Sequence, residues 1–357
     1  MAEPGAQHAG APTTPTLATP RLAPAALAKK FIFPALLVAA LLGVAFFVID
    51  MRRLGALLLQ ARLWPLAALL ACHLASLLLH TLRQHVLMRR AVPLGELFHA
   101  NNICNMVNSV LPFRAGEFAM ALALSRRASL RGTEILSMIL VDRLLGLLSI
   151  LTIFLATLPG FSPHGAAAVG LVQSGSSYLL AFGAIVSLML LATLLEERLV
   201  ALARAVLSRL PLPVESIVER LRAGINGLRV LFHLRTSLPA FALALSTWGC
   251  IIALNYWGMR SVSMEPTMTA AVFVTFLTVV GIMLVPTPSG LGTVHGASVL
   301  VLSMFGVGAE QALAFAILAH ALVTMTNIGL GLLSARRMDF HLGRVLETKA
   351  KGSAGPA

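Results

Sequence analysis

The sequence has little charge. Only 11% of its 357 residues are Asp, Glu, Lys or Arg, whereas a soluble domain carries about 25%. At the same time 58% of the residues are hydrophobic, which excludes intrinsic disorder for most of the chain. A soluble fold would have to bury nearly all of these side chains and would still lack charged groups for its surface. The composition therefore predicts a polytopic membrane protein.

Residues that carry catalysis or bind metals are also scarce. The three cysteines, Cys72, Cys104 and Cys250, stand singly in apolar runs and lack the spacing of metal ligands. The sequence has no Ser, His and Asp set on polar loops and no nucleotide motif. We therefore expect no cofactor, no metal and no enzymatic activity. The alternative is an intramembrane transferase that uses Asp142 or Glu117.

The charge that is present is mostly basic, with a formal net charge of +13. In a soluble domain this excess would suggest a nucleic-acid partner. Membrane proteins collect Lys and Arg in their cytoplasmic loops, which explains the excess without nucleic acid.

Hydrophobic runs long enough to cross a bilayer recur along the chain, since a hydrocarbon core of about 30 Å needs about 20 helical residues. We predict six full spans, at residues 31–49, 64–82, 135–158, 178–196, 237–259 and 309–333. Two further apolar regions, 97–125 and 268–306, are each broken in the middle by Pro and Gly. The predicted fold is an all-α polytopic membrane protein with two broken hairpins, which either turn back within the membrane or cross it.

The charge of the loops predicts the orientation of the spans. Loop 159–177 has no charged residue, whereas the stretch 197–236 carries seven Arg and the tail after residue 334 carries five Lys or Arg. The basic segments belong in the cytoplasm, together with the C-terminus. Counting spans from these anchors makes the two broken regions enter the membrane from opposite faces.

Matching features of the two halves recur at a nearly constant distance along the chain. The separation between Pro112 and Pro288 is almost the same as that between the starts of the spans 135–158 and 309–333. An odd number of crossings separates the copies, so we predict an inverted-topology repeat.

We expect the following domain organisation. A disordered tail covers residues 1–28, the membrane domain covers 29–335 with repeat halves at about 31–158 and 178–333, and a cytoplasmic tail covers 336–357. The basic insertion 197–236 has apolar residues at helical spacing. It forms either a solvated loop helix or an amphipathic helix that lies on anionic lipid.

The two breaks are the leading candidates for a binding site. Irregular backbone at membrane depth is tolerated only where protein buries it or where it lines a water-filled cavity. In transporters built from inverted repeats, such broken segments form the substrate site near the midplane. The alternative is that both breaks are ordinary tight turns.

The first break carries two charges, Arg114 and Glu117, and follows a row of amides. Asn101, Asn105 and Asn108 recur at helical spacing, so they share one face that is expected to meet protein or water. That face either lines a substrate groove or forms hydrogen bonds between helices.

A further pair of charges, Asp142 and Arg143, lies inside the predicted span 135–158. Charge at this depth is costly and is usually paired or functional. Neighbouring residues on a helix point about 100° apart, so the two are poorly placed to pair with each other. We expect Arg143 to pair with Glu117 and Asp142 to pair with Arg114.

The second break has no charge of its own. Pro288 opens a turn that contains Gly290 and Gly292, and the free N–H groups of these glycines suit an anion such as phosphate. His295 follows three residues later, and a lone His in such a place is more often a hydrogen-bonded interior residue than a catalyst.

Three segments together resemble a known family. They are residues 108–117 (NSVLPFRAGE), residues 141–145 (VDRLL) and residues 286–292 (PTPSGLG). In this order and spacing they resemble the lysylphosphatidylglycerol synthetase transmembrane, or flippase-like, family, over about residues 31–335. The resemblance implies translocation of a lipid between leaflets of the bacterial cytoplasmic membrane. The synthetase proper also has a soluble aminoacyl-transferase domain, and we expect this chain to make no aminoacyl lipid itself.

The sequence thus predicts a lipid or glycolipid translocase. Its partners are membrane lipids with an anionic or zwitterionic headgroup and, as an open alternative, a lipid-modifying enzyme. In this prediction Arg114 and Glu117 contact or gate the headgroup, and Asp142 and Arg143 shape the pocket. Gly290 and Gly292 of the second break line the opposing half. Two other functions stay open: a non-transporting scaffold for an envelope-lipid enzyme, and an ion-coupled carrier for a small solute.

Overall fold

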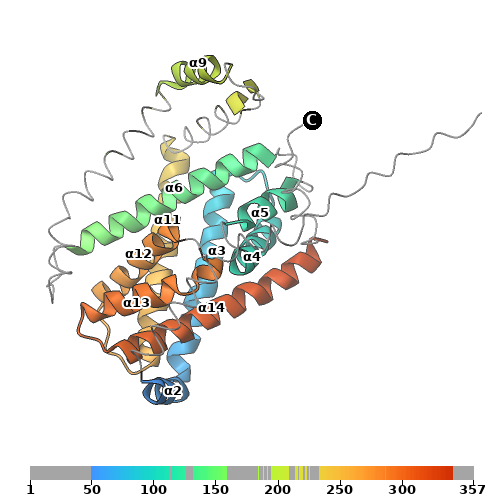
Figure 1. The fold of residues 1–357 in the computed structure, drawn as a ribbon. Helices are drawn as coiled ribbons and strands as arrows, with labels where there is room; N and C mark the ends of the chain where they lie inside the picture. Colours follow the sequence, from blue (N-terminus) through green and yellow to red (C-terminus); the bar gives the residue numbers. More distant parts are fainter. Residues whose placement is uncertain are drawn as a thin grey trace, which may run out of the picture.

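The computed structural model describes residues 50–111, 114–125, 132–158, 194–208, 233–285 and 287–340, together with short pieces between 184 and 225. Within these residues every regular element is a helix (Figure 1). The elements are α2 (Met51–Leu59), α3 (Leu63–Leu87), α4 (Leu94–Val110), α5 (Gly116–Ser125), α6 (Gly132–Thr157), α9 (Glu196–Leu207), α11 (Leu234–Ser261), α12 (Met268–Leu284), the 3-10 turn η3 (Pro288–Gly290), α13 (Thr293–Ser303) and α14 (Ala309–Arg337).

Four of these helices are long and apolar enough to cross a membrane, namely α3, α6, α11 and α14. They have 25, 26, 28 and 29 residues, which makes them roughly 37 to 44 Å long at about 1.5 Å per residue. They confirm four of the predicted spans. The predicted span 31–49 and most of the span 178–196 lie outside the described residues, as do the predicted tail 1–28 and residues 341–357.

The first of these spans is longer than predicted. Helix α3 continues to Leu87 and therefore contains Arg83, which is only 4% exposed. The predicted span 64–82 ends one residue before Arg83. A buried ion pair, described below, holds the last turn inside the bundle.

Both broken regions are helical hairpins. Helices α4 and α5 pack against each other, and so do α12 and α13. Their lengths of 17, 10, 17 and 11 residues correspond to about 15 to 26 Å, which is less than a hydrocarbon core of about 30 Å. Figure 1 shows the two hairpins at opposite ends of the molecule, between α6 and α14. Their broken tips meet, because η3 contacts α4.

The two halves repeat each other down to single hydrogen bonds. In the first half Asn101 of α4 donates to Thr81 of α3 at 3.2 Å, and in the second half Asn255 of α11 donates to Thr275 of α12 at 2.9 Å. The separation along the chain between Thr81 and Asn255 equals that between Asn101 and Thr275, and we call this separation the repeat offset. The same amide–hydroxyl bond therefore joins span to hairpin in both halves, with donor and acceptor exchanged.

Close helix packing holds the centre of the molecule together. Helices α3 and α11 pack along each other, and Gly258 of α11 lies against Leu69 and Phe315. The largest cluster of buried side chains surrounds this crossing and includes Phe154 and Phe273.

The basic insertion 197–236 is described only in part. Helix α9 covers its first residues, and Arg222 forms ion pairs with Glu196 at 3.6 Å and Glu197 at 3.5 Å. Much of the amphipathic helix predicted around residues 217–228 lies outside the described residues, so its relation to lipid stays a prediction.

Candidate functional site

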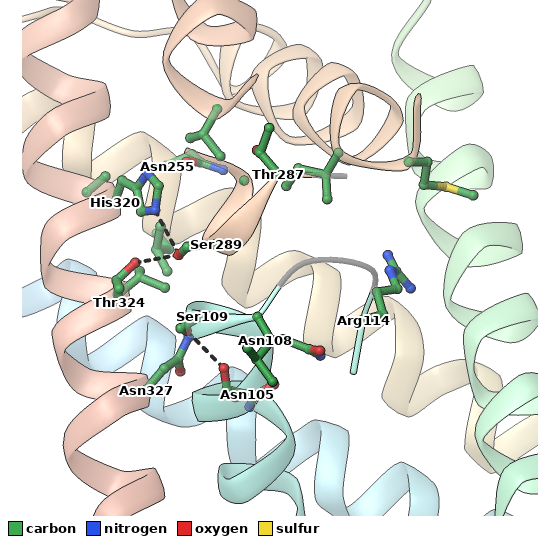
Figure 2. A pocket seen from close by; sticks show the side chains of 18 of the residues that line it. Asn105, Asn108, Ser109, Arg114, Asn255, Thr287, Ser289, His320, Thr324 and Asn327 are labelled. Atoms are coloured by element: carbon green, nitrogen blue, oxygen red, sulfur yellow. Dashed lines mark hydrogen bonds between the residues drawn. The ribbon is translucent and has the colours of Figure 1, made fainter. Parts of the chain in front are cut away.

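A polar pocket lies where the two broken tips meet. Its volume is about 680 Å³, and its walls come from both breaks and from α6, α11 and α14 (Figure 2). Its polar lining residues are Asn105, Asn108, Ser109, Arg114, Arg143, Asn255, Thr287, Ser289, His320, Thr324 and Asn327. The site therefore combines amides, hydroxyls and two guanidinium groups at the junction of the two repeats, as the inverted-repeat argument predicts.

The first break is closed by an amide that caps the next helix. The side-chain oxygen of Asn108 accepts a hydrogen bond from the backbone N–H of Gly116 at 2.8 Å. A side chain at position 116 would collide with the carbonyl oxygen of Cys104 and with Asn108 itself. Arg114 lies between Asn108 and Gly116 in the sequence and has a φ of 52°. This left-handed backbone conformation turns the chain back into the hairpin.

Two arginines that line the pocket share one carboxylate, that of Glu117, which is not itself a lining residue. Arg143 Nε lies 3.2 Å from Glu117 Oε1, and a guanidinium nitrogen of Arg114 lies 3.6 Å from the same oxygen. The predicted pair between Arg143 and Glu117 is confirmed. Two positive charges on one negative charge leave the trio with a net charge of +1 at the pocket wall. This arrangement suits an anionic group, because guanidinium groups bind phosphate and carboxylate through paired hydrogen bonds.

The predicted pair between Asp142 and Arg114 is wrong. Asp142 is fully buried and accepts from Arg83 Nε at 2.6 Å and from Gln84 at 3.2 Å, while His80 Nε2 lies 2.9 Å away. All three partners belong to α3. Since Asp142 and Arg143 point about 100° apart on α6, one meets α3 and the other meets the first hairpin. Asp142 thus joins two helices behind the pocket and does not line it.

The second break is held by a hydroxyl. Ser289 has a φ of 55°, and its Oγ lies 3.0 Å from both His320 Nε2 and Thr324 Oγ1 on α14 (Figure 2). The adjacent Gly290 has a φ of 73° and also lines the pocket. Residues other than glycine rarely adopt a positive φ. The side-chain contacts of Ser289 with α14 hold it in this conformation.

The expectation that this turn offers free N–H groups is wrong. The N–H of Gly290 donates to the carbonyl of Thr287 at 3.0 Å, and the N–H of Gly292 points to His295 Nδ1 at 3.4 Å. The N–H groups of both glycines are therefore bonded within the turn and are not free for an anion.

The remaining predicted site residues divide between the pocket and its surroundings. Asn105 and Asn108 line the pocket, whereas Asn101 turns to α3 and bonds Thr81. Glu117, Pro288, Gly292 and His295 are not among the lining residues, and the ring of His295 packs against that of His320 at 5.0 Å between centroids. The row of amides therefore has two roles: Asn101 bonds a neighbouring helix, and Asn105 and Asn108 face the pocket. The rotation of α4 about its axis decides which residue faces which side.

Sequence reasoning missed the polar side of α14. His320, Thr324 and Asn327 stand at i, i+4 and i+7 in a predicted span and all line the pocket. Asn327 is anchored from behind by His73 Nε2 at 3.1 Å. The spacing rule that revealed the amide row on α4 applies equally to these three residues, so the signal was present in the sequence.

The comparisons with known proteins agree with this architecture. A family model described as the lysylphosphatidylglycerol synthase TM region matches residues 31–331, and the chain belongs to this family. A search of curated proteins and a search of solved structures gave no match. The protein is thus an all-α polytopic membrane protein of a family whose description points to lipid metabolism or translocation.

Proposed function

We propose that the protein moves a lipid with a polar headgroup between the two leaflets of a bacterial cytoplasmic membrane. The observation that carries this proposal is the polar pocket between two opposed broken hairpins. A headgroup needs a polar path through the hydrocarbon core, whereas its tails do not. A pocket at the centre of an inverted repeat, with lipid on its outer side, offers such a path.

The chemistry of the pocket wall favours an anionic or zwitterionic headgroup. Arg114 and Arg143 share one carboxylate and retain a net positive charge, which suits a phosphate. Asn105, Asn255 and Thr287 offer amide and hydroxyl groups to the remaining polar atoms of a headgroup.

Apolar side chains beside both breaks suit the lipid tails. Val110 and Phe118 flank the first break, and Met283, Leu284 and Leu291 flank the second, and all five are exposed. In a bilayer such side chains face hydrocarbon. A lipid whose headgroup occupies the pocket would keep its tails in the membrane beside these residues.

The contact between Ser289 and His320 also resembles a nucleophile and its base. We assign it to the pocket wall for two reasons. Thr324 shares the same hydroxyl, and within the described chain His320 Nδ1 is buried without an acidic partner to orient the ring.

A leaflet-translocation assay tests the proposal. The purified protein is reconstituted in liposomes, and fluorescent lipids with different headgroups are followed with an impermeant quencher. We expect wild-type protein to accelerate the exchange of an anionic lipid, and Arg114→Gln with Arg143→Gln to reduce the rate at least tenfold. Arg89→Gln removes an exposed arginine outside the pocket and serves as the control.

Failure to move any headgroup, with or without an ion gradient, would contradict the proposal and favour a scaffold. Gradient-dependent uptake of a water-soluble compound by sealed vesicles would favour a solute carrier.

A further inference from the structure

A row of polar side chains continues from the pocket along the interface between α4 and α14. On α4 the row contains His99, Asn102 and Asn105, at spacings of three residues. On α14 it contains Thr324, Asn327 and Ser334, at spacings of three and seven. Both spacings keep the residues on one side of a helix, and the two helices pack against each other. We call these six residues the polar seam.

The seam connects the pocket with the end of the bundle at which α14 stops. Asn105, Thr324 and Asn327 line the pocket. At the other end His99 Nδ1 lies 3.1 Å from Ser334 Oγ, and α14 finishes shortly afterwards with Arg336 and Arg337. The polar groups therefore span the distance from the binding site to a basic surface.

Between these ends the seam is tightly closed around an unsatisfied amide. Asn102 is 1% exposed, and among the described residues neither its side-chain oxygen nor its nitrogen has a hydrogen-bond partner. Beside it Gly331 lets α14 approach so closely that a Cβ there would collide with Met106 and lie 2.9 Å from the Asn102 carbonyl oxygen. Burying an amide without hydrogen-bond partners costs free energy. The packing of α4 against α14 in this structure therefore does not explain why position 102 is an asparagine.

The other half of the repeat supplies an internal control. At the repeat offset, His99 and Asn102 correspond to Phe273 and Phe276 on α12. These two rings pack on Phe154 of α6, with ring centroids 5.0 Å and 3.9 Å apart. The equivalent interface of the same fold is thus aromatic. The fold itself therefore does not require polar residues at these positions. We attribute His99 and Asn102 to function.

We propose that the polar seam is the route by which the headgroup passes between the pocket and the basic end of the molecule, and that the structure holds this route closed. When α4 and α14 separate, the amide of Asn102 meets the passing headgroup, while the aromatic interface of α6 and α12 stays shut. This inference rests on the proposed translocase function and adds the path and its gate.

The substitution Asn102→Leu separates this role from a structural one. Leucine has the same number and branching of side-chain heavy atoms as asparagine, and it replaces the two unsatisfied polar atoms of Asn102 by methyl groups. We expect a higher thermal unfolding temperature, unchanged binding of the anionic lipid to the pocket, and a translocation rate at least tenfold lower. Ile103→Leu, a buried position on the same helix, is the control and leaves the rate unchanged. A wild-type rate in Asn102→Leu would overturn the proposal.

A cross-link tests the opening directly. His99→Cys and Ser334→Cys are introduced where Cys72, Cys104 and Cys250 have been replaced by Ala, and a short bifunctional thiol reagent with a reducible linker joins them. We expect the cross-linked protein to translocate lipid at least tenfold more slowly than the same double-cysteine protein after reduction. Undiminished translocation in the cross-linked protein would refute the gate.

The outcomes distinguish the two proposals. If the wild-type protein moves no lipid, the translocase function itself fails. If it moves lipid and the arginine variants do not, but Asn102→Leu and the cross-link have no effect, the seam proposal fails alone.

Discussion

Adjacent residues on α6 serve two different networks. Asp142 is fully buried and bound by Arg83, whereas Arg143 is partly exposed at the pocket and pairs with Glu117. Removing one partner of a buried ion pair leaves the other charge without compensation, which is more costly than losing a partly exposed pair. Substitutions that remove the charge of the carboxylate should therefore change the stability of the protein by different amounts in the two networks.

Asp142→Asn is expected to destabilise the protein by about 3–5 kcal/mol, because the buried guanidinium of Arg83 loses its counter-charge. Thermal or denaturant unfolding in detergent measures the change. Glu117→Gln is the comparison, with an expected loss of about 1 kcal/mol or less because its pairs are partly exposed. Equal destabilisation by the two variants would contradict this division.

At the scale of the elements, each hairpin depends on a glycine, and the two glycines correspond at the repeat offset. Gly116 makes room for the carbonyl of Cys104, and Gly290 adopts a φ of 73°. Their neighbours differ, since Asn108 closes the first break and Ile282 packs against the second. The repeat therefore keeps the glycine at the turn while it changes the chemistry around it.

Gly116→Ala is expected to destabilise the protein by about 1–3 kcal/mol, because the added methyl group overpacks the contact between α4 and α5. Gly55→Ala is a matched control, because a Cβ at this position meets nothing within 4 Å. Gly55 lies inside helix α2, where Ala is more favourable than Gly. Unfolding of both variants in detergent checks the prediction, and a stable Gly116→Ala protein would show that the hairpin adapts.

At the scale of the whole molecule, the two hairpins enter the bundle from opposite ends. The loop after α3, with Arg89, is on the basic side, and the end of α13 at Ser303 is on the other; both residues are exposed. The positive-inside rule predicts that the basic side faces the cytoplasm.

Arg89→Cys and Ser303→Cys, each in a background without the native cysteines, test this orientation. We expect an impermeant maleimide to label the Ser303 variant in intact cells and the Arg89 variant only after lysis. Labelling of both from the same side would contradict the inverted arrangement.

The sequence by itself determined the class of protein, the four long spans found among the described residues, the two breaks and the pairing of Arg143 with Glu117. These features depend on local composition, on charge at membrane depth and on the repeat distance. The polar face of α14 was equally readable from its spacing.

Only the tertiary structure decided which groups face one another. Asp142 pairs with Arg83 and not with Arg114, the N–H groups of Gly290 and Gly292 bond within their own turn, and Asn101 turns from the pocket to Thr81. The physical reason is that the partner of a buried polar group depends on the relative rotation of two packed helices. Packing over the whole bundle sets that rotation, and the spacing of residues along a single helix does not.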